Sequence, residues 1–256
     1  MHIHDYTIIR QVGYGCITCV YEAFDPRTGR VVALKVLRAD SEVADARRLF
    51  AREVALLQRF DHAHIPAFYA AVDGEPPALA HQLIRGSDVQ ARLNAADPFA
   101  ESDVIAWALD ICDAFTYLHT HPRTPVVFRD LKPAHIIVNG EGAAYLVDFN
   151  LAVDLPPGAA CVEADKAGTE GFAAPEQYEG QAGVTSDVYT LGATLHYVLT
   201  RRDPRQHPPF SFEPPRAFNP ALSESVEAVI MRALAHDPAD RYQSAAALRA
   251  ALVACE

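Results

Sequence analysis

Apolar and polar residues alternate along residues 6–38, which is the pattern of strands that bury one face. Turns rich in glycine and proline at residues 13–15 and 26–29 divide this stretch into three strands. Residues 67–72 and 78–84 form two more short runs of strand character. The first third of the chain is therefore predicted to form a five-stranded antiparallel sheet.

One helix is predicted within this sheet region, over residues 42–60. Phe50, Val54 and Leu57 recur at helical spacing and share one face, while charged residues occupy the other. An amphipathic helix of this kind buries its apolar stripe against a neighbouring element.

After Arg85 and Gly86 the pattern changes to helical spacing. The first long amphipathic helix is predicted over residues 101–121, and Ser102 with Asp103 before the apolar run suits its N-cap. Three further helices are predicted over residues 185–200, 223–235 and 244–254.

Two segments between these helices lack periodicity. Residues 151–175 contain several prolines and glycines and are predicted to form a long surface loop, and loops of that length in compact domains are usually functional. Residues 203–220 are rich in proline and are predicted to be irregular.

The order of elements, strands with one helix and then mostly helices, predicts an α+β fold of two unequal lobes. We expect an N-terminal lobe of residues 1–84, a C-terminal lobe of residues 85–256 and a hinge near residues 81–87.

Composition narrows the possible partners of this fold. The 256-residue chain carries a net charge of -11, which argues against nucleic acid or an anionic membrane surface as its main partner. It has no apolar run long enough to cross a bilayer, and its N-terminus lacks the basic-then-apolar layout of a signal peptide. We therefore expect a cytoplasmic protein with no membrane segment.

Cysteine usage fits the same expectation. The five cysteines are odd in number and sparsely placed, so a disulfide framework is not predicted. Cys16 and Cys19 form one C-x-x-C pair, but a structural zinc site needs a second ligand pair in matching context.

Candidate chemistry centres on residues 126–150, which read as a polar loop followed by two short strands and a glycine-bearing turn. The loop carries Asp130 and Lys132, and Asp148 follows the second strand. A hairpin would place the two aspartates at neighbouring ends. Two carboxylates and a lysine at one place predict phosphate and divalent-metal chemistry.

Two features of the first lobe point to the same chemistry. Gly13-x-Gly15 lies at a turn where the backbone could approach phosphates closely, although many such pairs are simple hairpin turns. Lys35 ends an apolar strand, and Glu53 on the following helix is its natural partner. Such a pair can hold a lysine against phosphate oxygens, or it can be a surface ion pair worth about 0–1 kcal/mol.

These residues together resemble the signature series of protein kinases, in order and over practically the whole chain. The segments RDLKP, GTEGFAAPEQY and SDVYTLG are similar to those of bacterial serine/threonine kinases of the eukaryotic-like type. The matching positions are Gly13-x-Gly15, Val32-Ala33-Leu34-Lys35, Glu53, Arg129 to Pro133, Asp148-Phe149, Gly168-Thr169, Ala174-Pro175-Glu176, Asp187 and Arg241. The resemblance implies a bilobal protein kinase fold.

The resemblance also implies catalytic roles. Lys35 would contact the α- and β-phosphates of ATP and pair with Glu53. Asp130 would accept the proton of the substrate hydroxyl, Lys132 would steady the γ-phosphate, and Asp148 would hold Mg²⁺.

A nucleotide site follows from the same comparison. The Gln82 carbonyl and the Ile84 N–H would bond adenine, with His81 at the gatekeeper position. The whole implied set of nucleotide-binding residues is Val12, Gly13, Gly15, Val20, Ala33, Lys35, Gln82, Ile84, Ile137 and Asp148.

Structural roles are implied as well. Glu176 and Arg241 would form an ion pair, and Asp187 would brace the backbone of the catalytic loop. Thr169 would contact both Asp130 and Lys132.

The chain departs from the family at three positions. Phe128 stands where the family has His before Arg-Asp, and an apolar ring is a plausible substitute there. Asn150 replaces the glycine after Asp148-Phe149, and asparagine tolerates the left-handed backbone that such a turn requires. His135 stands where the family has the Asn that binds a second Mg²⁺.

The change at His135 leaves two interpretations open. Imidazole is a poor Mg²⁺ ligand and a better one for Mn²⁺, although it can still donate a hydrogen bond to the catalytic-loop backbone. Asp148 alone could hold the metal of an active, slow or Mn²⁺-preferring kinase. Alternatively the domain binds nucleotide without turnover, as a pseudokinase and signalling scaffold. Retention of Lys35, Asp130 and Asp148 favours activity.

Two regulatory expectations follow from the loop residues. Residues 151–168 contain no Ser, Thr or Tyr, so Arg129 has no phosphorylated partner there, and we hypothesise that Glu163 or Asp165 takes that place. Between residues 210 and 222 three prolines interrupt the position of a docking helix, which is predicted to be missing or a single turn.

The predicted function is transfer of the γ-phosphate of ATP, with Mg²⁺ or Mn²⁺, to a Ser or Thr of a protein. Small-molecule phosphotransferases share the two aspartates, but Lys132 and the Gly168-Thr169 step suit a peptide substrate.

Overall fold

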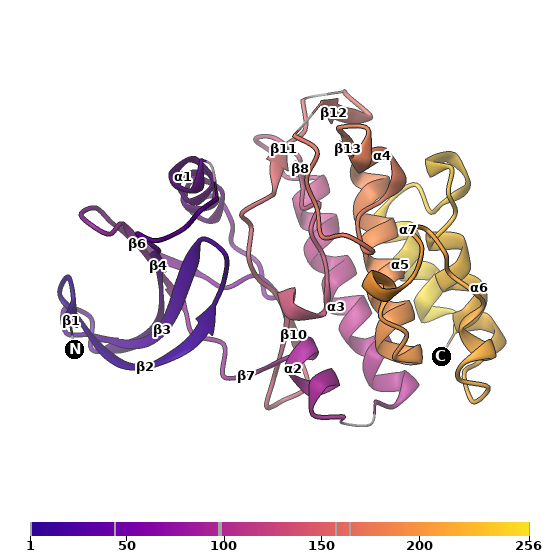
Figure 1. Ribbon diagram of the computed structural model, residues 1–256, viewed down its shortest axis with the longest axis horizontal. Coiled ribbons are helices and arrows are strands. Elements are labelled where there is room, and N and C mark those ends of the chain that lie inside the picture. The colour runs from indigo at the N-terminus through magenta and orange to yellow at the C-terminus, as the bar shows by residue number, and fades with distance from the viewer. Residues whose placement is uncertain (1, 44, 97–98, 157, 164, 256) are drawn as a thin grey trace. The chain divides into compact units, whose positions relative to one another are not determined.

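The computed structural model describes residues 2–43, 45–96, 99–156, 158–163 and 165–255 (Figure 1). The chain divides into two compact units: Met1–Arg85 with Asp148–Asn150, and Gly86–Val147 with Leu151–Glu256. Ala44, Pro157 and Ala164 fall inside segments for which structure was predicted and lie outside the described residues.

The first unit is built on an antiparallel sheet of six strands, so the prediction of five was wrong. The additional strand, β1, has only two residues, which pair with Tyr6 and Thr7 and are too few to show an alternating pattern. The spatial order is β1-β2-β3-β4-β6-β5. The strands are β1 (His2–Ile3), β2 (Tyr6–Tyr14), β3 (Thr18–Asp25), β4 (Arg30–Leu37), β5 (Phe68–Val72) and β6 (Ala78–Gln82).

The two faces of this sheet have different roles. One face carries an apolar cluster, and its buried members are Tyr6, Ala23, Val32, Leu34, Val36, Ala78 and Ala80. Successive residues of a strand point to opposite faces. Val20 and Lys35, which are paired across β3 and β4, therefore project from the other face.

Helix α1 (Ala46–Leu57) belongs to the same unit and is shorter than the predicted helix 42–60. It buries Phe50, Leu56 and Leu57, as an amphipathic helix should. It also buries Glu53, a charged residue that needs a partner at such a position.

The second unit is mainly helical, and four of its helices are those that the sequence predicts. They are α3 (Glu101–His119), α5 (Val184–Thr200), α6 (Glu224–Ala233) and α7 (Ala245–Val253), and α3 packs against α5 and α7 (Figure 1). The N-cap of α3 is Ala100, so the prediction of Ser102 and Asp103 was wrong. Asp103 instead lies in the first turn, where its charge suits the helix dipole.

Two short helices were not predicted. Helix α2 (Val89–Asn94) is capped by Asp88, whose carboxylate accepts the Ala91 N–H at 2.7 Å. Helix α4 (Pro175–Tyr178) is a single turn that begins with proline, the residue preferred at a first helical position.

The predicted hairpin of residues 126–150 is confirmed as β9 (Ile136–Asn139) and β10 (Ala144–Leu146). Strand β7 (Gly86–Asp88) joins it on the other side of β9. A Cβ at Gly86 would come within 2.0 Å of the Val138 carbonyl oxygen, so only glycine fits this close approach.

The predicted loop 151–175 contains two short strands. Strand β11 (Val153–Asp154) pairs with β8 (Val126–Val127), and β12 (Cys161–Glu163) pairs with β13 (Gln181–Gly183). Between residues 210 and 222 the only helical segment in the described chain is a 3-10 turn at Pro215–Ala217, which confirms the predicted single turn.

All five cysteines are free thiols. Over the described ranges, none of the helices has the length and apolar character needed to cross a bilayer.

Candidate active site

In the first unit, Lys35 lies between two carboxylates. Its Nζ donates to Glu53 Oε1 at 2.7 Å and to Asp148 Oδ1 at 3.0 Å. Lys35 is 5% exposed and Glu53 is 1% exposed, so the ion pair is buried. The predicted partnership of Lys35 and Glu53 is confirmed, and the alternative of a solvated surface pair is excluded.

Burial and charge oppose one another in this cluster. Burial works to lower the pKa of Lys35, but the carboxylates of Asp148 and Glu53 outweigh it and hold that pKa above its ordinary value. Burial raises the pKa of Glu53, and the Asp148 charge adds to this effect while Lys35 opposes it. One ammonium group beside two carboxyl groups favours a net negative charge, which suits the binding of a divalent cation.

The segment Asp148–Asn150 packs into this cluster. The Phe149 N–H donates to Glu53 Oε1 at 3.1 Å, and the Phe149 ring packs against Phe60 with centroids 5.4 Å apart. The Asn150 side-chain amide donates to Asp148 Oδ1.

The strained backbone of this segment is at Asp148. Asp148 has a φ of 70°, whereas Asn150 does not adopt a positive φ. The prediction of a left-handed Asn150 was therefore wrong. Asn150 instead contributes its side chain, whose Nδ2 reaches Asp148 and whose Oδ1 is buried without a hydrogen-bond partner.

The glycine-containing turn begins later than predicted. Gly13 is still within β2, opposite Val20, and a Cβ at Gly13 would come 3.3 Å from the Val20 Cβ. The turn is closed by the Gly15 N–H, which donates to the Thr18 carbonyl at 2.8 Å. Val12, another expected nucleotide-binding residue, is 40% exposed on β2.

The expected adenine-binding residues follow strand β6. His81 pairs with Ala33 across the sheet, and its Nδ1 lies 3.0 Å from the Gln82 carbonyl. Burial lowers the pKa of His81 to about 4, so the ring is neutral at pH 7 and donates this hydrogen bond. The Gln82 carbonyl keeps a second lone pair for a ligand. Ile84 lies in the segment between β6 and β7, which has no regular secondary structure.

In the second unit, Asp130, Lys132 and Thr169 form a closed network. Thr169 Oγ1 donates to Asp130 Oδ1 at 2.7 Å. Lys132 Nζ donates to Thr169 Oγ1 at 2.7 Å and to Asp130 Oδ2 at 3.2 Å. The predicted contacts of Thr169 with both residues are confirmed.

The backbone before Asp130 is held in an unusual conformation. Arg129 has a φ of 72°, which costs energy for a residue with a side chain. Asp187 accepts the Phe128 N–H at 2.8 Å and the Arg129 N–H at 2.7 Å, which confirms its predicted bracing role.

His135 is a structural part of this loop. Its Nδ1 lies 2.6 Å from the Asp130 carbonyl, and because a carbonyl only accepts, Nδ1 carries the proton. The Phe128 ring packs edge-on against His135. Among the residues that the structure describes, no three His, Cys, Asp or Glu side chains gather as a metal site, so the role of His135 as a metal ligand stays a prediction.

The guanidinium of Arg129 contacts the following loop through main-chain oxygens. Its Nε donates to the Leu151 carbonyl at 2.6 Å, and Nη1 donates to the Asp165 carbonyl at 3.2 Å. Asp165 thus contacts Arg129 through its carbonyl oxygen, and the hypothesis that its carboxylate pairs with Arg129 stays a prediction. Glu163, the other candidate, is exposed in β12.

Glu176 and Arg241 form the predicted ion pair, with Nη1 and Nη2 at 2.8 and 2.9 Å from the two carboxylate oxygens. Arg241 is 0% exposed. Burial works to raise the pKa of Glu176, but hydrogen bonds from Arg241 and Ser186 hold it below its ordinary value.

Comparisons with known proteins agree with this geometry. The family model described as the protein kinase domain matches residues 6–253. The chain belongs to the protein kinase domain family.

Bacterial kinases are among the similar proteins. Serine/threonine-protein kinase PknB of Mycobacterium tuberculosis strain H37Rv is 32% identical over 272 residues, which cover 98% of this chain and 43% of the relative. A probable serine/threonine-protein kinase of Streptomyces coelicolor is 30% identical, over 95% of this chain and 39% of the relative. This kinase domain therefore spans less than half the length of these relatives.

The expected site residues of the kinase domain are divided between the two units. The first unit holds Val12, Gly13, Gly15, Val20, Ala33, Lys35, Glu53, Gln82, Ile84 and Asp148, and the second holds Asp130, Lys132, His135 and Ile137. One buried polar residue beside the second group, Gln177, was not predicted, because a single glutamine carries no periodicity or charge signal.

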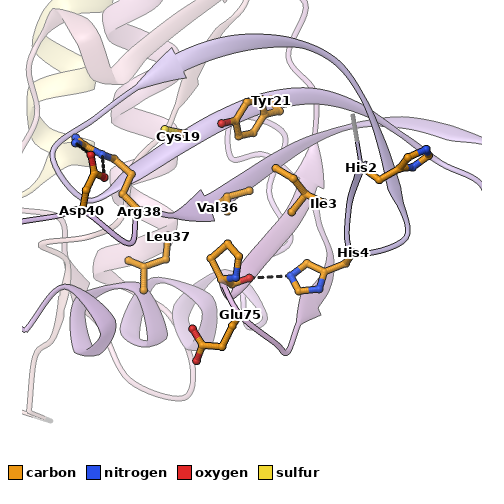
Figure 2. Close-up of a pocket in the computed structure, with 11 residues that line it drawn as sticks. His2, Ile3, His4, Cys19, Tyr21, Val36, Leu37, Arg38, Asp40 and Glu75 are labelled. Atoms are coloured by element: carbon orange, nitrogen blue, oxygen red, sulfur yellow. Dashed lines mark hydrogen bonds and ion pairs between the residues drawn. The ribbon is translucent and has the colours of Figure 1, made fainter.

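A cavity of about 470 Å³ lies elsewhere in the first unit of the kinase domain. Figure 2 shows its lining by His4, Cys19, Tyr21 and Val36, with the His4 imidazole hydrogen-bonded to the Pro76 carbonyl at 2.7 Å. None of the expected nucleotide-binding residues lines this cavity. Val36, which does line it, points to the face of the sheet opposite Lys35.

Proposed function

We propose that this kinase domain transfers the γ-phosphate of ATP to the hydroxyl of a serine or threonine in a protein. The observation that carries the proposal is the network of Asp130, Lys132 and Thr169, in which a carboxylate is held beside an ammonium group. The names of the relatives support the serine/threonine class.

Asp130 has the position and chemistry of a proton acceptor. Lys132 Nζ donates a hydrogen bond to its Oδ2, and the Thr169 hydroxyl fixes the direction of Oδ1. An ionised carboxylate held in one orientation can take the proton of an incoming hydroxyl. Lys132 can place its charge near a transferring phosphoryl group, whose oxygens are negative in the transition state.

The Lys35 cluster is suited to a nucleotide with its metal. The carboxylate of Asp148 is 31% exposed and is a hard oxygen ligand of the type that Mg²⁺ or Mn²⁺ prefers. Asn150 Oδ1, a buried amide oxygen without a hydrogen-bond partner, belongs to the same segment. These residues fit a divalent cation, which when bound would neutralise phosphate charge. Lys35 would hold phosphate oxygens with Glu53 as its counter-charge.

His135 supports the active form over the pseudokinase alternative. Its Nδ1 makes a hydrogen bond to the Asp130 carbonyl, so it keeps the catalytic-loop backbone in place. We propose that Asp148 supplies the principal metal contact, and that His135 adds a preference for Mn²⁺ because imidazole suits that ion better than Mg²⁺.

The proposed lobe boundaries, partners and location rest on the sequence. We propose residues 1–84 as the nucleotide-phosphate lobe and residues 85–256 as the catalytic lobe. A net charge of -11 disfavours nucleic acid as a partner, and a cytoplasmic location is proposed for this part of the protein.

The test is transfer of radiolabelled γ-phosphate to a serine- and threonine-containing substrate protein, with Mg²⁺ and with Mn²⁺. We expect transfer with at least one metal and phosphoserine or phosphothreonine in the product. Asp130→Asn keeps the shape and removes the base, and should lower kcat by at least about 100-fold. Asp103→Asn, an exposed change on α3, is the matched control. Nucleotide binding without transfer under either metal would replace this function with the pseudokinase alternative.

A further inference from the structure

Gln177 is a buried amide in α4 with both of its N–H donors committed. Its Nε2 donates to the Arg129 carbonyl at 2.9 Å and to the Ala167 carbonyl at 3.1 Å. Its Oε1 accepts the Ala174 N–H at 3.0 Å. The side chain is 3% exposed, so water cannot replace these partners.

The orientation of this amide is fixed by its neighbours. Two carbonyl oxygens face one end and an N–H faces the other. A flipped amide would set its oxygen against two carbonyl oxygens and leave the Ala174 N–H without an acceptor. The side chain therefore acts as a double donor towards the two loops.

The two carbonyls belong to the residues just before the proposed catalytic network. Arg129 immediately precedes Asp130, and Ala167 precedes Gly168-Thr169. Since Thr169 Oγ1 donates to Asp130 Oδ1 at 2.7 Å, the contacts close a ring that runs from Asp130 through Gln177 to Thr169.

Both loops adopt a positive φ where Gln177 holds them, and this is strained at Arg129, which carries a side chain. Arg129 has a φ of 72° and Gly168 a φ of 144°. A Cβ at Gly168 would come 2.7 Å from the Ala173 Cβ and 3.2 Å from Gln177 Nε2. Asp187 holds the Arg129 N–H, and Gln177 holds the carbonyl of the same residue. A conformation of this kind persists only when its surroundings determine it from several sides.

We propose that Gln177 is a positioning residue for phosphoryl transfer, one that sets the geometry of Asp130 by tying the catalytic loop to the segment that carries Thr169. The inference rests on the proposed function for its kinetic consequence. Gln177 touches neither reacting group, and acts through the hydrogen bond between Thr169 and Asp130.

Two substitutions test this role in the full chain. Gln177→Met keeps the length and removes both donors, while Gln177→Glu keeps the shape and turns an oxygen towards the two carbonyls. Displacement of a reacting group by a fraction of an ångström to one ångström costs up to about 100-fold in rate. We expect kcat to fall by about 10- to 100-fold in both variants, with the KM for ATP unchanged.

Gln243→Glu is the matched control. Gln243 Nε2 also donates to backbone carbonyls, those of Pro238, Ala239 and Arg241, but it contacts neither loop of the network. The same amide-to-carboxylate change at Gln243 should leave kcat near the wild-type value.

A double-mutant cycle separates positioning from a general structural role. In a Thr169→Val background the hydroxyl link to Asp130 is absent, so Gln177→Met should cost much less than it costs in the wild type. Equal fold losses in both backgrounds would overturn the proposal.

Hydrogen exchange gives a readout that does not depend on activity. In Gln177→Met, amide exchange should rise in residues 126–132 and 166–173 and stay unchanged in α6. If the wild type transfers no phosphate, the proposed function fails, but this comparison still decides the role of Gln177. Unchanged exchange in both segments would overturn it.

Discussion

Lys35 shows how a single buried charge organises the first unit. Its ammonium group satisfies Glu53 and Asp148 together, and Glu53 in turn accepts the Phe149 N–H. Charges so poorly exposed to water are tolerated only when they are paired and hydrogen-bonded. The residue that would bind phosphate is therefore also the one that permits two carboxylates to lie side by side.

Replacing Lys35 with methionine should destabilise the fold through those carboxylates. Loss of one partner of a buried pair leaves an uncompensated charge, which costs about 3–5 kcal/mol. We expect a loss in the free energy of unfolding near the lower end of that range at pH 7, measured by urea denaturation, because Asp148 is 31% exposed. Lys35→Met combined with Glu53→Gln is the control and should recover part of the loss.

The pH dependence of this variant has a definite sign. Burial already raises the pKa of Glu53, so the folded state binds a proton that the unfolded state has released, and stability falls as pH rises through that window. Since Lys35 lowers the pKa of Glu53 in the folded state, removing Lys35 raises that pKa and extends the window to higher pH. The deficit of Lys35→Met should therefore be smaller at pH 5 than at pH 8, and an equal deficit at both would contradict the explanation.

At the scale of elements, the segment after Asn150 is held without a phosphate. Strand β11 pairs with β8 and β12 pairs with β13, and both pairs border an apolar cluster of Val127, Leu155 and Ala182. Arg129 adds main-chain contacts to Leu151 and Asp165. We expect main-chain pairing and apolar packing to hold this segment in the way that a phosphate group holds such a segment by attracting arginine.

We therefore expect kinase activity to be independent of phosphorylation in this segment. Phosphatase treatment should leave kcat unchanged, whereas Val162→Asp, which places a charge against the apolar cluster, should lower it by about tenfold or more. Val253→Asp, at an exposed site on α7, is the control. Loss of activity on dephosphorylation would contradict the expectation.

The long elements could be predicted from the sequence because burial imposes a period on them. Helix α5 and the strands β2 to β4 appear where the pattern places them. Strand β1 and helix α2 were missed because two and six residues are too few to show a period. The N-cap of α3 was misplaced because alanine at residue 100 offers no side-chain acceptor to signal the start.

In the candidate site, contacts between motif residues could be predicted, but the local backbone conformation could not. Lys35, Asp130 and Thr169 belong to ordered motifs, and the contacts predicted for them are present. A left-handed backbone was predicted at Asn150 because asparagine tolerates it, but the chain adopts that conformation at Asp148. Backbone strain of this kind is decided by tertiary contacts, which a local pattern does not contain.

For the whole molecule, the path of the chain between its two units matters most. The first unit includes Asp148–Asn150 in addition to Met1–Arg85, so the chain passes between the units three times. Those three residues supply a counter-charge to Lys35, a hydrogen bond to Glu53 and the ring that packs on Phe60. The first unit is thus completed by a segment that is distant in sequence.

A fragment of residues 1–85 should consequently fold poorly by itself. It lacks the Phe149 ring, which is 1% exposed in the intact chain, and removal of a buried phenylalanine costs about 3–5 kcal/mol. A unit of this size has only about 5–15 kcal/mol of stability, and the loss of the Asp148 counter-charge adds to the cost. We expect a broad thermal transition for the fragment by circular dichroism. In the full chain, Phe149→Ala should raise amide exchange in α1 and β4 and leave α6 protected. A fragment that melts as sharply as the intact protein would show that the sheet is self-sufficient.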